Sequence, residues 1–264
     1  MRTATRRRAS DDPADPTTTT ALPVLSAATA KVVNMTRVVL VHGSGRAGAA
    51  AWPEQRLLAG RYDCLFLRRR GYEASGEPAR GDAEADAASI LEHLEPARGG
   101  HVVAHSGGAV SALLAAVREP GLVRSLTLIE PAAFSLTRDL PATARHVAAF
   151  APLYVARERL SADAFAHRFT ELLTGTGDGA PTGVDAVRLQ RQQPPWEAPL
   201  TIVPGVPTLV VTGGWEPVYE EVATFLATTG ARHVIVPGGH RPHDTAAGHA
   251  HIAGFLAELE RDAA

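Results

Sequence analysis

The chain has 264 residues, of which 45% are hydrophobic and 20% are charged, and its formal net charge is -2 at pH 7. This length and composition are ordinary for one globular domain with a single large core. No apolar run approaches the roughly 20 residues that a membrane span requires, and the charge balance does not indicate a nucleic-acid partner or an anionic membrane surface. We therefore expect a soluble protein with neither kind of partner.

The single cysteine and the N-terminal segment bear on location and order. Cys64 has no partner within the chain, so no intramolecular disulfide can form, and the cytoplasm is the expected location. Residues 1–35 combine an arginine cluster at 6–8, several aspartates and a threonine run at 17–20. Such a polar, low-complexity stretch predicts a disordered N-terminal tail.

A regular alternation of short apolar β-type runs and amphipathic helical stretches begins at residue 37. This alternation is typical of an α/β fold with a mostly parallel, doubly wound sheet and helices on both faces. Strands are predicted at residues 37–42, 62–67, 101–104, 125–129, 207–211 and 233–236. Helices are predicted at residues 49–60, 82–95, 108–118, 217–228 and 247–261.

A long segment separates the fourth and fifth predicted strands. Residues 131–204 take the place of a single crossover helix and include two helical stretches at 142–157 and 161–173. An insertion that leaves the carboxyl edge of a parallel sheet covers the crevice where such sheets bind ligands. We interpret residues 131–204 as a helical cap on a core formed by residues 36–130 and 205–264.

The strongest local signal is a serine between small residues at a strand-to-helix turn. Ser106 follows the strand at 101–104, and Ala104 and Gly108 stand two positions to either side of it. A serine on such a sharp turn needs small neighbours because the backbone packs closely there. The helix that begins near Gly107 also directs free N–H groups to the place where an oxyanion would form. The pattern indicates a nucleophilic serine, with a phosphate-binding glycine turn or a plain helix cap as the alternatives.

Further polar groups follow other strands of the predicted sheet. The His-Gly-Ser-Gly sequence at 42–45 follows the first strand and suits a turn whose backbone approaches a ligand. Glu216 follows the fifth strand, and His240 follows the sixth. A neutral serine needs an adjacent base, and the imidazole needs an acidic partner that fixes its tautomer. The order Ser106, Glu216, His240, each at a strand end of one sheet, satisfies that requirement.

Together these segments resemble the α/β-hydrolase superfamily over residues 36–261. The matching elements are the oxyanion turn at 42–43, the nucleophile elbow at 104–108, the Gly-x-x-acid-Pro segment at 213–217 and the Gly-x-His segment at 238–240. The resemblance implies an enzyme that needs no metal or organic cofactor. The site residues that it implies are the nucleophile Ser106, the base His240, the acid Glu216, and the oxyanion-hole N–H groups of Ser44 and Gly107.

The acid is the member of this set for which the sequence offers two candidates. The family more often has aspartate at the position of Glu216, and glycine at that of Ala104. Some members take the acid from after the preceding strand, where this chain has Glu130. We prefer Glu216, since glutamate can fill the role and the flanking glycine and proline match the family's segment. Glu130 is the alternative acid, and it could equally cap a lid helix or be a solvated loop residue.

Several side chains near these segments are candidates for the substrate pocket. His42 and His105 flank the expected site, where they bond backbone or line the pocket, and Gly43 and His105 are candidate substrate-binding residues. Trp52, Trp196 and Trp215 are candidate pocket walls, because their rings offer large apolar surfaces, and core packing is an equal alternative for each.

Two clusters of charged or titratable residues are assigned to the surface instead. His243, His249 and His251 could join His240 as metal ligands, but no thiolates accompany them, and we interpret them as surface histidines without a metal. The arginines at 68–70 follow a strand at the catalytic edge, where one of them could bind an anionic substrate. We favour a solvated loop for these arginines.

The residues and the resemblance predict a serine hydrolase that cleaves a small to medium, partly hydrophobic ester, lactone or thioester through an acyl-enzyme on Ser106. One alternative is a carbon–carbon bond hydrolase of the ring-cleavage type, because the turn at 42–45 resembles that of such enzymes. Another is a lyase, cyclase or ligand-binding member of the fold. The expected partner is a small-molecule substrate, and a homodimer is compatible with the sequence.

Overall fold

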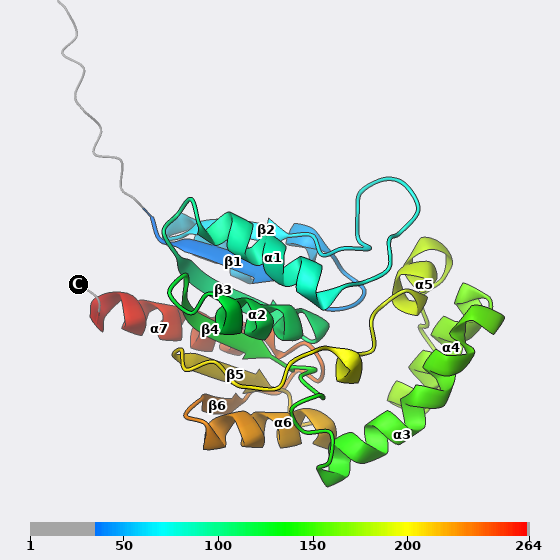
Figure 1. Cartoon of the computed structure of the whole chain (residues 1–264). Helices are drawn as coiled ribbons and strands as arrows, with labels where there is room; N and C mark the ends of the chain where they lie inside the picture. Colours follow the sequence, from blue (N-terminus) through cyan, green and yellow to red (C-terminus); the bar gives the residue numbers. More distant parts are fainter. Residues whose placement is uncertain (1–34, 263–264) are drawn as a thin grey trace, which may run out of the picture. The chain divides into compact units, whose positions relative to one another are not determined.

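Six parallel strands form one sheet in the described part of the chain, residues 35–262 of this computed structural model (Figure 1). The predicted tail, residues 1–35, lies outside the described residues except for Met35. The order across the sheet is β2-β1-β3-β4-β5-β6, and this confirms the predicted fold class. The bounds are Arg37–Val41 (β1), Asp63–Leu67 (β2), Gly100–His105 (β3), Val123–Ile129 (β4), Thr208–Thr212 (β5) and Arg232–Ile235 (β6).

The central strands bury apolar side chains on both faces of the sheet. In β1, Val39 and Val41 belong to one hydrophobic core, whereas Val38 and Leu40 belong to the other. Successive side chains of a strand point to opposite faces, so a strand covered on both sides needs apolar residues at every position. Full burial of each such side chain stabilises the fold by about 1.5–3 kcal/mol.

Helices cover each face of this sheet. Helices α1, α2 and α6 pack into the core that contains Val39, and α7 packs with the short 3-10 helices η1 and η2 into the core that contains Val38. The carboxylate of Asp82 accepts hydrogen bonds from the first free N–H groups of α1 and so caps its start. The bounds are Ala83–Leu94 (α1), Gly107–Arg118 (α2), Pro217–Thr228 (α6), Ala246–Asp262 (α7), Gly48–Ala51 (η1) and Gln55–Gly60 (η2).

The predicted helix at residues 49–60 is wrong in kind, because the structure has η1 and η2 there instead. Pro53 stands between the two short helices. A proline has no N–H to donate, and its ring clashes with the preceding turn, so Pro53 disfavours one continuous α-helix through this position.

Residues 131–204, which we call the cap segment, fold into helices between β4 and β5. Helices α3, α4 and α5 lie beyond the ends of the strand arrows in Figure 1. Helices were predicted close to α3 and α4, whereas α5 was not predicted, because its eight residues are too few to show a clear helical period. The bounds are Pro141–Ala156 (α3), Arg157–Arg159 (η3), Ala162–Thr174 (α4), Gly183–Gln190 (α5), Pro195–Glu197 (η4) and Pro242–Asp244 (η5, after β6).

Helix α6 of the core holds the beginning of α3. The carboxylate of Glu221 accepts hydrogen bonds from the N–H groups of Ala142 at 2.9 Å and Thr143 at 2.7 Å. These are among the first N–H groups of α3, which have no partner within their own helix, and a negative charge is favourable at a helix N-terminus. One carboxylate therefore joins the cap segment to the core.

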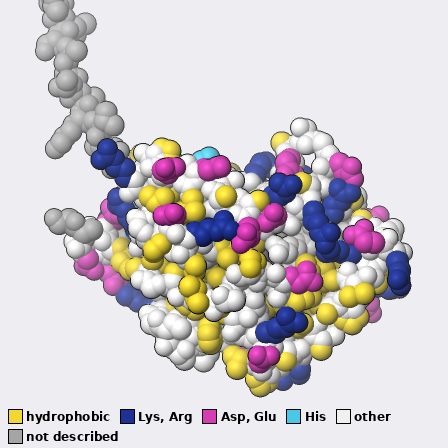
Figure 2. All heavy atoms as spheres, viewed as in Figure 1, with side chains coloured by type: hydrophobic (Ala, Val, Ile, Leu, Met, Phe, Trp, Pro, Cys, Tyr) yellow, Lys and Arg dark blue, Asp and Glu magenta, His cyan; other side chains and the backbone are white. Residues whose placement is uncertain are grey.

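The surface seen in Figure 2 mixes Arg with Asp and Glu, and neither sign dominates this face. None of the helices between residues 35 and 262 combines the length and the apolar composition that crossing a membrane requires.

Candidate active site

Ser106 stands at the sharp turn between β3 and α2. Its backbone has φ 53° and ψ -123°, a strained conformation for a residue with a side chain, and such strain recurs at functional turns. A Cβ on Gly108 would lie 2.6 Å from the carbonyl oxygens of both Val41 and His42. The small residue predicted two positions after the serine is therefore a steric requirement of the turn.

The turn after β1 comes very close to this serine. A Cβ on Gly43 would lie 2.7 Å from His105 Nδ1 and 2.8 Å from Ser106 Cβ, so the backbone reaches this position only at a glycine. His42 braces the turn, since its Nδ1 donates to the Gly43 carbonyl at 2.7 Å and its Nε2 accepts from the Arg69 N–H at 3.2 Å. Burial, and then the charge of Arg69, lower the pKa of His42 to about 3, so this ring is neutral at pH 7.

Ser44 and Gly107 line the same pocket as Ser106. Gly107 is the first residue of α2, so its N–H has no acceptor within the helix and carries part of the positive end of the helix dipole. The two residues thus lie where the sequence predicted the oxyanion hole, and their use as one stays a prediction.

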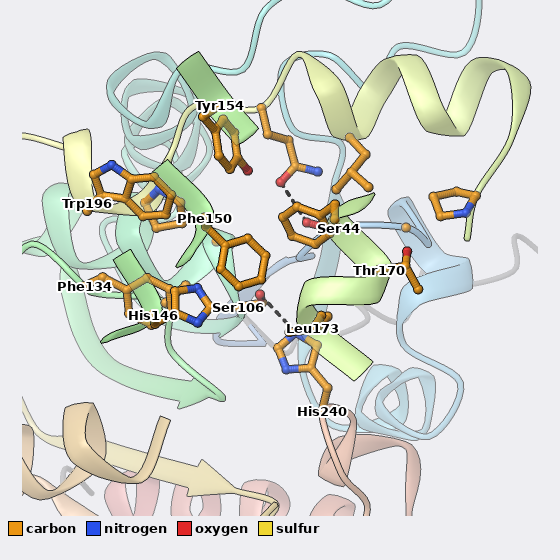
Figure 3. A pocket seen from close by; sticks show the side chains of 18 of the residues that line it. Ser44, Ser106, Phe134, His146, Phe150, Tyr154, Thr170, Leu173, Trp196 and His240 are labelled. Atoms are coloured by element: carbon orange, nitrogen blue, oxygen red, sulfur yellow. Dashed lines mark hydrogen bonds between the residues drawn. The ribbon is translucent and has the colours of Figure 1, made fainter. Parts of the chain in front are cut away.

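His240 lies beside Ser106 on the loop after β6. The Ser106 hydroxyl donates to His240 Nε2 at 3.1 Å (Figure 3). Gly239, with φ 57°, allows the chain to turn directly before the histidine. The imidazole is 26% exposed and lines the pocket, so it can reach both the serine and a bound molecule.

Glu130 holds the other nitrogen of this imidazole. His240 Nδ1 donates to Glu130 Oε2 at 3.2 Å. The carboxylate is fully buried and also accepts from the Gly213 N–H at 2.6 Å and from Trp215 Nε1 at 2.7 Å. A buried carboxylate needs such partners, because an unpaired charge inside a protein is costly. Ser106, His240 and Glu130 therefore form one continuous chain of hydrogen bonds.

This geometry corrects our preference for Glu216 as the acid. Glu216 is the residue before α6, and no hydrogen bond or ion pair within residues 35–262 joins it to His240. The glycine-rich segment that suggested Glu216 instead supplies donors, from Gly213 and Trp215, to the alternative acid Glu130. Glu130 reaches this place because β4 and β5 are neighbours in the sheet.

Two neutral histidines lie behind His240, with their rings tilted to one another. The ring of His105 lies 4.7 Å from that of His240 and 4.6 Å from that of His243, and His105 Nε2 donates to the His240 carbonyl at 2.8 Å. Burial lowers the pKa of His105 well below its usual range and that of His243 to about 4. Neutral rings here do not oppose a positive charge on His240.

The prediction that His243 is a surface histidine is wrong, because its side chain is buried.

The middle arginine of the 68–70 run also differs from the solvated residue that we predicted. Arg69 is buried, and its Nε donates to Asp86 at 2.8 Å across from α1. Asp86 accepts in addition from the N–H of Arg70 at 2.7 Å. This ion pair lies next to the turn after β1, where Arg69 also donates to the His42 carbonyl at 3.4 Å.

A pocket of about 230 Å³ opens in front of Ser106, between the sheet edge and the cap segment (Figure 3). Aromatic rings dominate its wall and belong mostly to the cap segment: Phe134, Phe150, Tyr154, Phe169, Trp196 and Tyr219. Burial raises the pKa of Tyr154 and of Tyr219, so both keep their hydroxyl protons.

The structure places only part of the predicted pocket residues at this wall. Trp196 lines the pocket. Trp52 does not, because it is fully buried on the opposite face of the sheet against His243. Trp215 holds Glu130, and His105 supports His240, so these two side chains serve the residues of the site and are not part of the wall.

Sequence reasoning missed the aromatic face of α3. His146, Phe150 and Tyr154 are spaced four residues apart and all line the pocket. Residues at this spacing lie on one side of a helix, so the signal was present in the predicted helix at 142–157. It was not distinguishable from an ordinary core-facing stripe without the position of the helix over Ser106.

The arrangement of serine, imidazole and carboxylate defines what chemistry the site can perform. An imidazole bonded to a serine hydroxyl can accept its proton, and a carboxylate on the opposite nitrogen orients the ring and stabilises the cation that forms. The N–H groups of Ser44 and Gly107 are the ones that the sequence predicts to hold the negative oxygen of a tetrahedral intermediate. These are the groups that nucleophilic acyl transfer requires.

The chain belongs to the alpha/beta hydrolase family, whose model matches residues 38–251. No match to a curated protein was found. Among solved structures, NosK from Streptomyces actuosus aligns with a TM-score of 0.56 and 22% identity, over 86% of this chain and 99% of that one.

Two other solved structures are similar over the same part of the chain. The enol-lactonase from Burkholderia xenovorans LB400 has a TM-score of 0.61 and 16% identity, over 85% of this chain and 92% of that one. MenH from S. aureus has a TM-score of 0.56 and 17% identity, over 86% and 95%. At these identities the similarity shows the shared fold alone.

Proposed function

We propose that the protein is a serine hydrolase that cleaves an uncharged, largely apolar carboxylic ester, lactone or thioester. The observation that carries this proposal is the chain of hydrogen bonds from Ser106 through His240 to Glu130, at the base of a pocket with aromatic walls. The match to the hydrolase family supports the reaction class, and the enol-lactonase among the similar structures is one hydrolytic precedent on this fold.

The reaction proceeds in two half-reactions on the serine. Ser106 Oγ bonds to the carbonyl carbon while its proton passes to His240 Nε2, and the carbonyl oxygen takes the negative charge beside the Ser44 and Gly107 N–H groups. His240 then gives this proton to the leaving oxygen or sulfur as its bond to carbon breaks. Water attacks the resulting acyl-enzyme with His240 as the base, which releases the acid and restores Ser106.

The pocket wall indicates the kind of substrate. Among the described residues none of those lining the pocket is Lys or Arg, and its single carboxylate, Asp185, is paired with Arg188 at 2.8 Å. A carboxylate or phosphate on the substrate would therefore lose its water without gaining a cationic partner. A volume of about 230 Å³ and aromatic walls favour a compact acyl group with an aromatic or aliphatic body.

The direct test measures turnover of 4-nitrophenyl esters of increasing acyl length by the wild type and by Ser106→Ala. We expect turnover by the wild type and a loss of about 10⁴-fold or more in kcat in the variant, as for other triad nucleophiles. Labelling with a fluorophosphonate, read by intact mass, should occur in the wild type and be absent in Ser106→Ala. If the wild type neither turns over esters nor takes the label, the proposal fails, and carbon–carbon bond cleavage or a non-hydrolytic role takes its place.

A further inference from the structure

One polar side chain on the cap has no part in the chain of hydrogen bonds at Ser106. His146 belongs to α3 and lines the same pocket as Ser106 and His240, and Figure 3 shows its ring directed into that pocket. One ring face stacks on Phe150 at 4.3 Å and 18°, and Phe134 packs against the ring at 4.8 Å. These contacts involve the apolar faces of the imidazole and leave its two nitrogens free to form hydrogen bonds.

The nitrogens of His146 have no protein partner in the described part of the chain, since no hydrogen bond or ion pair there involves them. Two other polar groups of the pocket already have protein partners. The Ser44 hydroxyl donates to Gln192 at 2.8 Å, and Asp185 is paired with an arginine of its own helix. The ring is half-buried and its nitrogens are open to the pocket, so a bound molecule that covers them must offer a hydrogen bond in place of solvent.

The charge state of this ring limits what the partner can be. Burial lowers the pKa of His146 to about 4, so at pH 7 the ring is neutral and presents one N–H donor and one bare nitrogen acceptor. A neutral imidazole gives a carboxylate or phosphate no counter-charge. A hydroxyl group fits it best, because a hydroxyl can donate to the bare nitrogen or accept from the N–H.

We infer that His146 is a specificity-determining residue that binds a hydroxyl group carried by an aromatic ring of the substrate. The ring of that substrate packs against the aromatic wall formed by Phe134, Phe150 and their neighbours. The ring of His146 already packs against these two phenylalanines. The inference rests on the proposed function, in that it takes the pocket at Ser106 as the substrate site.

The experiment compares 4-nitrophenyl esters of 3-phenylpropanoic acid with the esters of its three ring-hydroxylated isomers and three ring-methylated isomers. We expect the wild type to prefer at least one hydroxylated isomer by about tenfold or more in kcat/KM over the unsubstituted and methylated esters, because a site left with an unpaired polar group discriminates strongly. His146→Phe keeps the stacked ring and removes both nitrogens. It should abolish this preference, so that the ratio of kcat/KM between the preferred hydroxylated ester and the unsubstituted ester falls to about one.

Two further variants separate recognition from damage to the fold. His146→Gln restores a donor and an acceptor without the ring and should recover part of the preference. His251→Phe makes the same exchange at an exposed position on α7 and should leave the preference as in the wild type. Absence of any preference for a hydroxylated isomer in the wild type, or its full survival in His146→Phe, overturns the inference.

Binding to the non-hydrolysing Ser106→Ala variant distinguishes failure of this inference from failure of the proposed function. The ligands are 3-phenylpropan-1-ol and its ring-hydroxylated isomers, and their affinities are measured by titration calorimetry with and without His146→Phe. A hydroxyl-dependent affinity that His146→Phe removes supports the inference even if every ester is inert. Equal affinities for hydroxylated and unsubstituted ligands overturn it even if esters are cleaved.

Discussion

The carboxyl edge of the sheet and the cap segment hold their pocket side chains in different ways. At the sheet edge, backbone conformation and hydrogen bonds position each group, as in the positive φ of Ser106 and the three donors to Glu130. In the cap, the pocket face of α3 is held by ring contacts, and the nitrogens of its one imidazole have no hydrogen-bond partner among residues 35–262. A hydrogen-bonded network tolerates few changes, whereas an aromatic wall accepts other shapes of similar volume.

The residues expected to carry out the reaction and those expected to select the substrate therefore lie on different segments of the chain. The groups that would make and break bonds belong to segments that follow β1, β3, β4 and β6, and the groups that surround the substrate belong mostly to α3, α4 and η4. Changes at the sheet edge are therefore expected to lower kcat for every substrate. Changes in the cap are expected to alter the ratio between substrates.

The largest effect after loss of the serine itself is expected at Glu130. Glu130→Gln removes the charge that stabilises a protonated His240 and should lower kcat by about 10²- to 10⁴-fold. Glu216→Gln is the matched change at the other candidate acid and should stay within about threefold of the wild type. Steady-state kinetics on one ester decide the matter, and an equal loss in the two variants would contradict the assignment of Glu130.

A methyl group on the turn after β1 should have the next largest effect. Gly43→Ala places a Cβ 2.7 Å from His105 and 2.8 Å from Ser106, so the turn must move away from the serine. We expect kcat/KM to fall about 100-fold, as when one oxyanion donor is lost. Gly121→Ala, where a Cβ meets nothing within 4 Å, is the control and should leave kcat/KM unchanged. Activity in Gly43→Ala at the wild-type level would show that this close approach is dispensable.

A smaller effect is expected in the dependence of stability on pH. The pKa of His146 is lowered to about 4 in the folded chain against about 6.5 when unfolded, so the unfolded state takes up the proton first as pH falls. The contribution of His146 to the free energy of unfolding is fully present above about pH 6.5 and is lost progressively as the pH falls to about 4. Between pH 7.5 and pH 5, His146→Phe should therefore lose about 2 kcal/mol less free energy of unfolding than the wild type, measured by urea denaturation. Parallel curves for the two proteins would rule out a neutral, half-buried His146.

The smallest effect is expected where the cap meets the sheet edge. Gln192 accepts from the Ser44 hydroxyl at 2.8 Å and donates to the Tyr72 hydroxyl at 2.9 Å, so it ties the cap segment to the turn after β1. Gln192→Ala should raise KM about fivefold, the equivalent of roughly 1 kcal/mol for one net hydrogen bond. Gln193→Ala is the control, because Gln193 anchors the same segment to Ala83 of α1 at 2.9 Å without touching Ser44. A KM that rises equally in both variants would indicate general loosening of the cap.

The sequence by itself determined the features whose physical cause is local. The turn at Ser106 depends on small residues at fixed offsets, and the strands depend on apolar runs of a characteristic length, so both are readable within a few residues of the chain. The sheet order then brings the loops after β3 and β6 to one edge, where Ser106 and His240 meet as predicted.

Only the tertiary structure decided which carboxylate reaches His240 and which side chains surround the substrate. Glu130 follows β4 and Glu216 follows β5, and these two strands are neighbours in the sheet. The choice between the two carboxylates depends on side-chain direction and on the hydrogen-bond donors at Gly213 and Trp215, which no local pattern specifies. The wall residues on α3 show ordinary helical spacing, and they line a pocket because the helix is placed over Ser106. Such placement arises from contacts between residues far apart in the chain, and these are absent from any short stretch of its sequence.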